Sequence, residues 1–160
     1  DYLNSELAWN SSLDRNELID NYFDNMYGVA AKEMKNFYNQ CKTWFKNASE
    51  AEGWDGYSIN ARMTKYWFDY STIKGFFDTL DKAYAAIEVY KTTDEAKYNK
   101  IKSHIDAEWL FPARVALGFY KEEFAADYAE MKTKFTTLCN SFKMVKLGES
   151  DSLEDFLKSL

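Results

Sequence analysis

The chain has 160 residues, with 20 basic and 26 acidic side chains and a formal net charge of −6 at pH 7. This acidic excess favours solubility and argues against a surface that binds nucleic acid or an anionic membrane. No run of about 18 apolar residues is present, so no membrane-spanning helix is predicted. One proline and six glycines leave no flexible linker, and we expect a single domain over residues 1–160.

Three helices are predicted before residue 47. Residues 2–9 are expected to form the end of a helix, followed by a turn. Asp14 and Glu17 form a capping-box pattern, in which the Asp carboxylate accepts a bond from an otherwise unpaired amide and Glu17 reaches back. The helix that follows is expected to end at Gly28 in a left-handed conformation. The third helix carries a stripe at helical spacing: Ala30, Met34, Phe37, Tyr38, Cys41, Trp44 and Phe45.

Residues 47–71 are the least regular part of the sequence, with turn-forming glycines among Trp and Tyr residues. Aromatic rings stack on the apolar faces of sugars, so this segment is a candidate glycan-binding edge. Alternatively the rings fold inward onto the helices, which the helical spacing of Tyr66, Trp67 and Tyr70 favours. The candidate carbohydrate-binding residues are Trp54, Asp55, Tyr57, Arg62, Tyr66 and Trp67.

Four further helices are predicted after residue 70. One begins at Ser71 or Thr72, and another begins at the capping pattern of residues 92–95 and runs to Trp109. Pro112 should break or kink that helix, because proline lacks the amide donor. An apolar stripe then predicts one helix of about 30 residues, about 45 Å long, and Ser152 caps a short last helix. The stripe is Ala113, Leu117, Tyr120, Phe124, Tyr128, Met131, Phe135, Leu138 and Phe142.

The fold class expected is all-α, a bundle of about six helices with one long helix of about 30 residues between Pro112 and Leu147. Cys41 and Cys139 are expected to be buried thiols, with a single disulfide between them as the alternative. His104, the only histidine, is expected to have a surface or helix-packing role. No metal, cofactor or catalytic residue is predicted. Asp55 is read as a turn residue, and a row of acidic residues, Glu123, Asp127 and Glu130, as a solvated face.

The most specific pattern in the sequence is Leu7-Ala8-Trp9-Asn10, then Asp14, Leu18-Ile19, Tyr27-Gly28 and Ala30-Ala31. It resembles the C-terminal helical region of a bacterial glycoside-hydrolase-like family of unknown function, at the junction where the barrel of an α-glucuronidase-like protein meets its helical domain. A weaker likeness covers residues 114–149, and residues 47–110 carry none.

The resemblance implies that this chain is the C-terminal part of a larger, secreted or cell-envelope, glycan-processing protein. Its main partner would be the upstream domain of the same protein. A glycan, or a second copy of the chain in a homodimer, would be additional partners. Nucleic acid and membranes are not expected partners. An independent helical module that binds a glycan or a protein through the aromatic-rich loop is the alternative. We expect this chain alone to hydrolyse no glycoside, and Trp54 and Tyr57 to be its most exposed aromatic residues.

Overall fold

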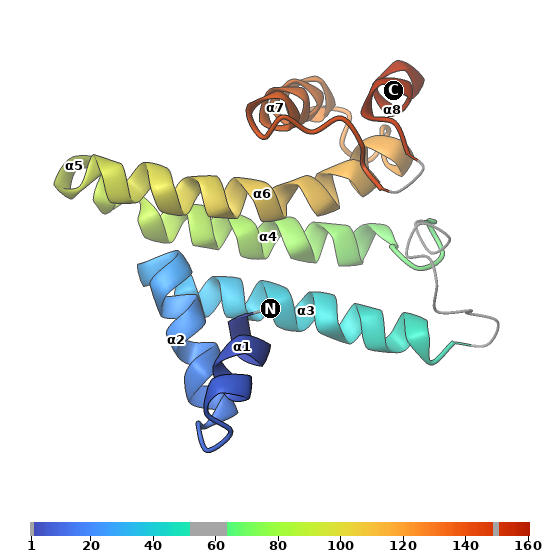
Figure 1. The fold of residues 1–160 in the computed structure, drawn as a ribbon. Coiled ribbons are helices and arrows are strands. Elements are labelled where there is room, and N and C mark those ends of the chain that lie inside the picture. Colours follow the sequence, from blue (N-terminus) through green and yellow to red (C-terminus); the bar gives the residue numbers. More distant parts are fainter. Residues whose placement is uncertain (1, 52–63, 149–150) are drawn as a thin grey trace. The chain divides into compact units, whose positions relative to one another are not determined.

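The computed structural model describes residues 2–51, 64–148 and 151–160. The prediction of an all-α fold is confirmed, because the described residues form helices and no β-strand, with only an isolated bridge between Lys146 and Ser152 (Figure 1). Five of the described helices have 13 residues or more, whereas about six helices were expected. In chain order the elements are α1 Tyr2–Trp9, α2 Arg15–Tyr27, the 3₁₀ turn η1 Gly28–Ala30, α3 Ala31–Ser49, α4 Tyr70–Ile87, α5 Tyr90–Thr93, α6 Glu95–Phe119, α7 Tyr128–Ser141 and α8 Leu153–Ser159.

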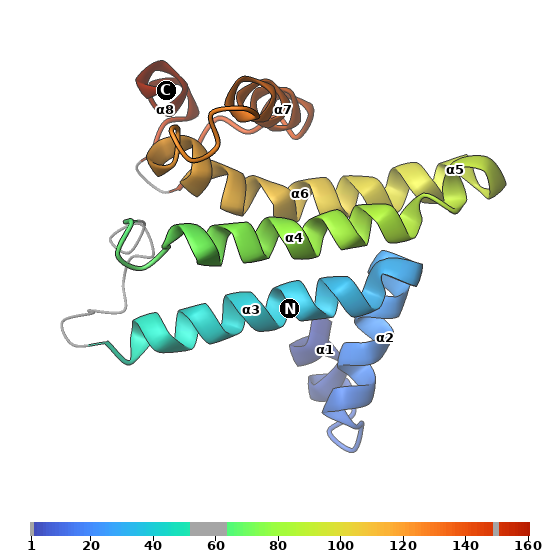
Figure 2. The same cartoon turned by 180° about the vertical axis from the view of Figure 1, so that it is seen from behind.

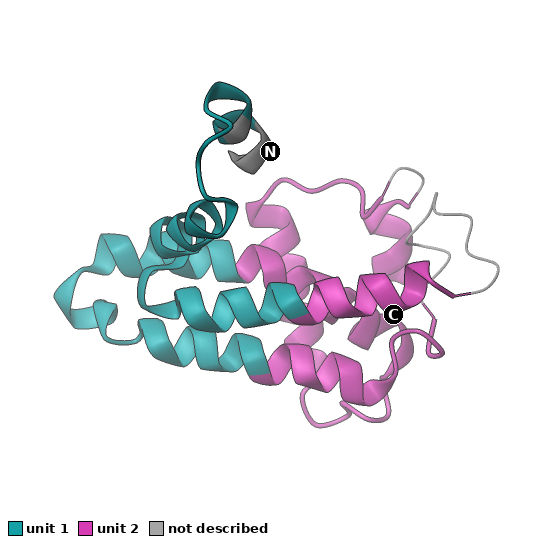
Figure 3. Cartoon of the chain, turned by 90° about the horizontal axis from the view of Figure 1, so that it is seen from below, with its two compact units in different colours: residues 1–39, 79–105 teal, residues 40–78, 106–160 magenta. Residues whose placement is uncertain are grey.

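The chain divides into two compact units, coloured separately in Figure 3. Unit 1 comprises residues 1–39 and 79–105, and unit 2 comprises residues 40–78 and 106–160. Helices α3, α4 and α6 each contribute one part to each unit. The expectation of one domain over residues 1–160 stays a prediction. Among the described helices, none combines the length and apolar character needed to cross a bilayer.

Local capping chemistry sets the start of α2 in unit 1. The Oδ1 atom of Asp14 accepts bonds from the backbone amides of Asn16 and Glu17, at 2.7 and 3.1 Å. Gly28 ends the helix with φ 52° and ψ −122°, so the predicted positive φ is present but ψ is not that of a left-handed helix. The larger buried apolar side chains of this unit are Leu18, Phe23, Tyr27, Met34, Phe37, Leu80, Ile87, Ile101 and Ile105.

The core of unit 2 is rich in aromatic rings. Trp44 and Phe68 stack with their ring centroids 3.9 Å apart, and Phe68 also packs edge-on against Phe111. Each such ring pair contributes about 0.5–1.5 kcal/mol of stability beyond the contribution from burying its apolar surface. The other buried side chains of this core include Ile73, Phe76, Trp109, Leu117, Tyr120, Tyr128, Met131, Phe135 and Cys139.

Pro112 was predicted to break or kink the helix near Trp109. The helix does not break there, because α6 continues to Phe119 (Figures 1 and 2). Proline in a helix interior costs about 3 kcal/mol. Here Pro112 is itself buried, and it is followed by the fully or nearly fully buried Ala113, Val115 and Leu117. Burial of these side chains offsets the missing hydrogen bond, since helices in proteins gain most of their stability from tertiary packing.

The long helix is present but lies elsewhere than predicted. The longest described helix is α6, with 25 residues, whereas the stripe from Pro112 to Leu147 is divided between the end of α6, turns at residues 121–127, and α7. Bonds from the Phe124 amide to the Tyr120 carbonyl and from Asp127 to Phe124 repeat every three to four residues, as in a helix. Tyr120 and Tyr128 therefore both stay buried across the turns, and apolar spacing alone could not reveal the interruption.

Candidate functional site

Two of the six predicted carbohydrate-binding residues, Tyr66 and Trp67, lie in the described part of the chain. They occupy a turn before α4, in which the amides of Trp67 and Phe68 both donate to the Thr64 carbonyl. Tyr66 is 81% exposed and Trp67 is half-buried. Their rings meet edge to face, with centroids 4.9 Å apart. The remaining four, Trp54, Asp55, Tyr57 and Arg62, lie outside the described residues, as does the expectation that Trp54 and Tyr57 are the most exposed aromatics.

The turn at residues 64–68 is held by two bonds to its backbone carbonyls. The indole Nε1 of Trp44 donates to the carbonyl of Trp67 at 2.8 Å. The hydroxyl of Tyr120 donates to the carbonyl of Phe68 at 2.5 Å. Burial, with the nearby charges of Asp69 and Glu123 adding to it, raises the pKa of the Tyr120 phenol. The hydroxyl therefore stays protonated and able to donate this bond.

Asp69, the acid nearest to these rings, caps α4. Its Oδ1 accepts from the backbone amide of Thr72 and from the hydroxyl of Ser71, both at 2.8 Å. These bonds, the Thr72 amide foremost, lower the pKa of the Asp69 carboxyl. The helix accordingly begins at Tyr70, just before the predicted start at Ser71 or Thr72. The carboxylate has a structural role that the sequence did not indicate.

Tyr70 is less exposed than Tyr66 and packs against two rings, those of Tyr120 and Phe124. It is 37% exposed and lies 5.8 Å from the Tyr120 ring and 5.3 Å from the Phe124 ring, measured between centroids. The ammonium of Lys65 lies 5.0 Å from the Tyr120 ring centroid. Among the described aromatics of this segment, Tyr66 is therefore the ring with most of its surface available to a ligand.

The other reactive side chains that the sequence singled out have packing roles. His104 shares a hydrogen bond of 2.9 Å with the Met26 carbonyl and meets the Tyr27 ring edge-on, as expected for helix packing. Cys41 and Cys139 are free thiols, so the alternative of a disulfide is wrong; Cys139 is buried as expected, whereas Cys41 is only partly buried. Burial, with the charge of Glu108 adding to it, raises the pKa of Cys41 to about 12. Among the described residues no His, Cys, Asp and Glu side chains gather into a group that could hold a metal.

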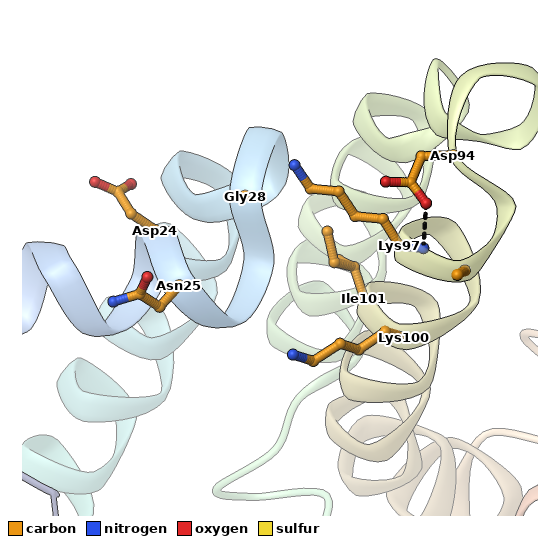
Figure 4. Close-up of a pocket in the computed structure, with 8 residues that line it drawn as sticks. Asp24, Asn25, Gly28, Asp94, Lys97, Lys100 and Ile101 are labelled. Atoms are coloured by element: carbon orange, nitrogen blue, oxygen red, sulfur yellow. Dashed lines mark hydrogen bonds between the residues drawn. The ribbon is translucent and has the colours of Figure 1, made fainter.

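An open pocket of about 520 Å³ lies within unit 1, between the end of α2 and the beginning of α6 (Figure 4). This pocket was not predicted from the sequence, because its two sides come from segments far apart in the chain. Figure 4 shows the side chains of Lys97 and Lys100 extending from α6 across the pocket toward α2. The lining residues are Asp24, Asn25, Gly28, Asp94, Ala96, Lys97, Lys100 and Ile101.

Gly28 allows the two sides of this pocket to approach each other. A Cβ atom at this position would lie 3.3 Å from Cδ1 of Ile101 and 3.5 Å from the hydroxyl of Tyr90. Its φ of +52° also lies in the region that side chains rarely adopt. Glycine is therefore required here by backbone conformation and favoured by space.

Comparison with protein-family models, with curated proteins and with solved structures found no match for this chain. The resemblance at residues 7–31 therefore stays a prediction from the sequence.

Proposed function

We propose that this chain is a non-catalytic C-terminal helical domain of a bacterial, glycoside-hydrolase-like protein that processes glycans. It packs on an upstream catalytic barrel and can form a subunit interface, and the parent protein is secreted or held in the cell envelope. The observation that carries the proposal is the exposure of Trp9, which is 92% exposed at the end of α1. Trp is among the side chains that most often anchor protein interfaces. Trp9 also lies within the segment on which the resemblance rests.

The use of polar side chains supports a scaffolding role. Within unit 1, His104 bonds to the backbone carbonyl of Met26. Within unit 2, Arg114 donates to the Leu147 carbonyl at 2.8 Å, and Tyr128 donates to the Leu117 carbonyl at 3.0 Å. Each bond fixes one segment to another. These side chains are of types that can act in catalysis, but here they hold the helices in place.

The first test is to determine the coding sequence that precedes residue 1. We expect several hundred codons for a catalytic domain, and a start codon or a signal peptide directly before Asp1 would contradict the proposal. The upstream segment is then co-expressed as a separate tagged polypeptide, and capture of this chain is measured. We expect capture of the unmodified chain.

Two matched variants locate the interface. Trp9→Ala should lose capture by the upstream segment, because it removes the exposed anchor. Tyr66→Ala also removes an exposed aromatic, here 81% exposed, but from unit 2. It should be captured like the unmodified chain. Equal capture of Trp9→Ala and the unmodified chain would remove Trp9 as the anchor and with it the basis of the proposal.

A second candidate function is glycan binding through the segment around Tyr66. The exposure of Tyr66 beside the half-buried Trp67 favours it, because such a ring can stack on a sugar. Titration with oligosaccharides, followed by tryptophan fluorescence, should then give a saturable signal that Tyr66→Ala abolishes and Trp9→Ala retains. The two functions thus predict opposite behaviour for the same pair of variants.

A further inference from the structure

We propose that the pocket of unit 1 binds a small organic carboxylate between the ammonium groups of Lys97 and Lys100. This site is separate from Trp9 and from the aromatic segment, so the inference is independent of the proposed function. The pocket volume, about 520 Å³, falls in the range of roughly 300–1,000 Å³ in which small-molecule sites are found.

The two lysines are arranged to receive an anion. Figure 4 shows Lys97 extending toward the Gly28 end of the pocket and Lys100 extending toward α2. Within the described part of the chain, neither lysine forms an ion pair with a carboxylate. The ammonium of Lys97 is positioned by the Tyr90 ring, whose centroid lies 4.4 Å away. Two ammonium groups thus offer six N–H donors on one side of the pocket.

The two acids of the lining do not occupy these donors. Oδ1 of Asp94 accepts from the backbone amide of Lys97 at 2.9 Å and so caps α6. The carboxylate of Asp24 points away from both lysines in Figure 4. The lining nevertheless holds two acids and two bases, so its formal charge cancels. A ligand with one negative charge suits this balance better than a multiply charged one, because the acids repel additional charge.

The remaining surfaces of the pocket fit the body of such a ligand. Asn25 presents an amide with both donor and acceptor capacity, which can bond to hydroxyl groups. Ile101 is 3% exposed and forms an apolar base beside Gly28. A short carboxylate with hydroxyl groups, such as a hydroxy acid, would use all of these groups. Because the pocket is open to water, we expect binding in the millimolar range.

The experiment is a titration of the whole chain followed by the backbone amide NMR signals of residues 24–28 and 94–101. Sodium acetate, sodium gluconate and sodium phosphate are compared with sodium chloride at the same ionic strength. Acetate and gluconate should give saturable shifts at these residues, with gluconate the tighter of the two. Chloride should give none. Shifts that equal those of chloride, or phosphate binding more tightly than both carboxylates, would overturn the assignment.

Four variants, one of them a control at Lys102, test the two lysines. Lys97→Met and Lys100→Met keep most of the length of the side chain without its charge and should each weaken gluconate binding by roughly fivefold. Lys102→Met is the matched control, since Lys102 lies on the same helix beside the Tyr84 ring and does not line the pocket. It should bind like the unmodified chain. Equal weakening by Lys102→Met would mean a diffuse charge effect and would contradict a site. Lys97→Arg, which keeps the charge, should bind gluconate more tightly than Lys97→Met.

Discussion

The two units use their polar side chains in different ways. In unit 2, Trp44, Arg114, Tyr120 and Tyr128 all donate to backbone carbonyls of distant segments. In unit 1, Lys97 and Lys100 extend into an open pocket instead. These four side chains of unit 2 therefore stabilise its own architecture.

The largest expected loss of stability comes from truncating a buried side chain in the core of either unit. Phe37 of unit 1 is 2% exposed and Phe135 of unit 2 is fully buried. Replacing either by Ala should cost about 3–5 kcal/mol, the lost transfer free energy together with a cavity. Urea unfolding followed by circular dichroism measures both. Phe142→Ala, at a position 37% exposed, is the control and should cost less than about 1 kcal/mol. If each core variant shifts a separate transition, the units unfold independently, and a common shift would show that they unfold together.

Removing the hydrogen bond from Tyr120 to the Phe68 carbonyl tests whether the polar side chains of unit 2 stabilise its fold. Tyr120→Phe should cost about 1–3 kcal/mol, because the buried Phe68 carbonyl loses its donor. Tyr66→Phe removes the same hydroxyl from an exposed ring and should change stability by less than about 0.5 kcal/mol. Equal effects at the two positions in chemical denaturation would contradict a structural role for the Tyr120 hydroxyl.

Gly28→Ala should cost about 1–2 kcal/mol and disturb the pocket of unit 1, since the backbone there has positive φ and Ile101 lies close. Gly75→Ala is the matched control, because Gly75 lies inside α4 with nothing within 4 Å of an added Cβ. That substitution should stabilise the chain by about 0.4–1 kcal/mol. Thermal unfolding measures the two opposite signs, and destabilisation by both would point to a general intolerance of glycine replacement.

The smallest expected effect is the pH dependence from Asp69. Its folded pKa is lowered, so the carboxylate form favours the folded state, and the contribution is present above the ordinary pKa of 3.8. It is lost as the pH falls through the folded pKa. Because the group is exposed, the change should stay below about 1 kcal/mol. Asp69→Asn keeps a good helix cap. This variant should therefore lose less stability than the unmodified chain between pH 5 and pH 2, and parallel curves would contradict the effect.

Three helix starts with local causes were predictable from the sequence, whereas the Asp69 cap of α4 was not. The caps at Asp14, Asp94 and Ser152 mark the starts of α2, α6 and α8, because each side chain bonds to an amide two or three residues ahead. The end of α6 was not predictable. The turns after Tyr120 preserve the three- to four-residue spacing, and burial around Pro112 offsets its missing donor.

The candidate sites depend on distant partners, which is why the sequence left them open. The turn that carries Tyr66 and Trp67 is held by Trp44, 23 positions from Trp67, and by Tyr120, 52 positions from Phe68. Helical spacing suggested that these rings turn inward, yet Tyr66 is exposed. The pocket of unit 1 joins the end of α2 to the start of α6, and its two lysines had no local pattern that distinguished them from other surface lysines.

The contacts of Arg114 influence which part of unit 2 unfolds locally first. Its guanidinium donates to the Leu147 carbonyl and, at 2.6 Å, to Asp151, 37 positions away. Helix α8 has only seven residues, too few to be stable in water alone. Besides its Ser152 cap, α8 has the Phe156 ring, which lies 5.7 Å from that of Phe135. The amide protons of residues 153–159 should therefore exchange with solvent as one cooperative group, and they should exchange faster once Arg114 no longer holds the preceding loop.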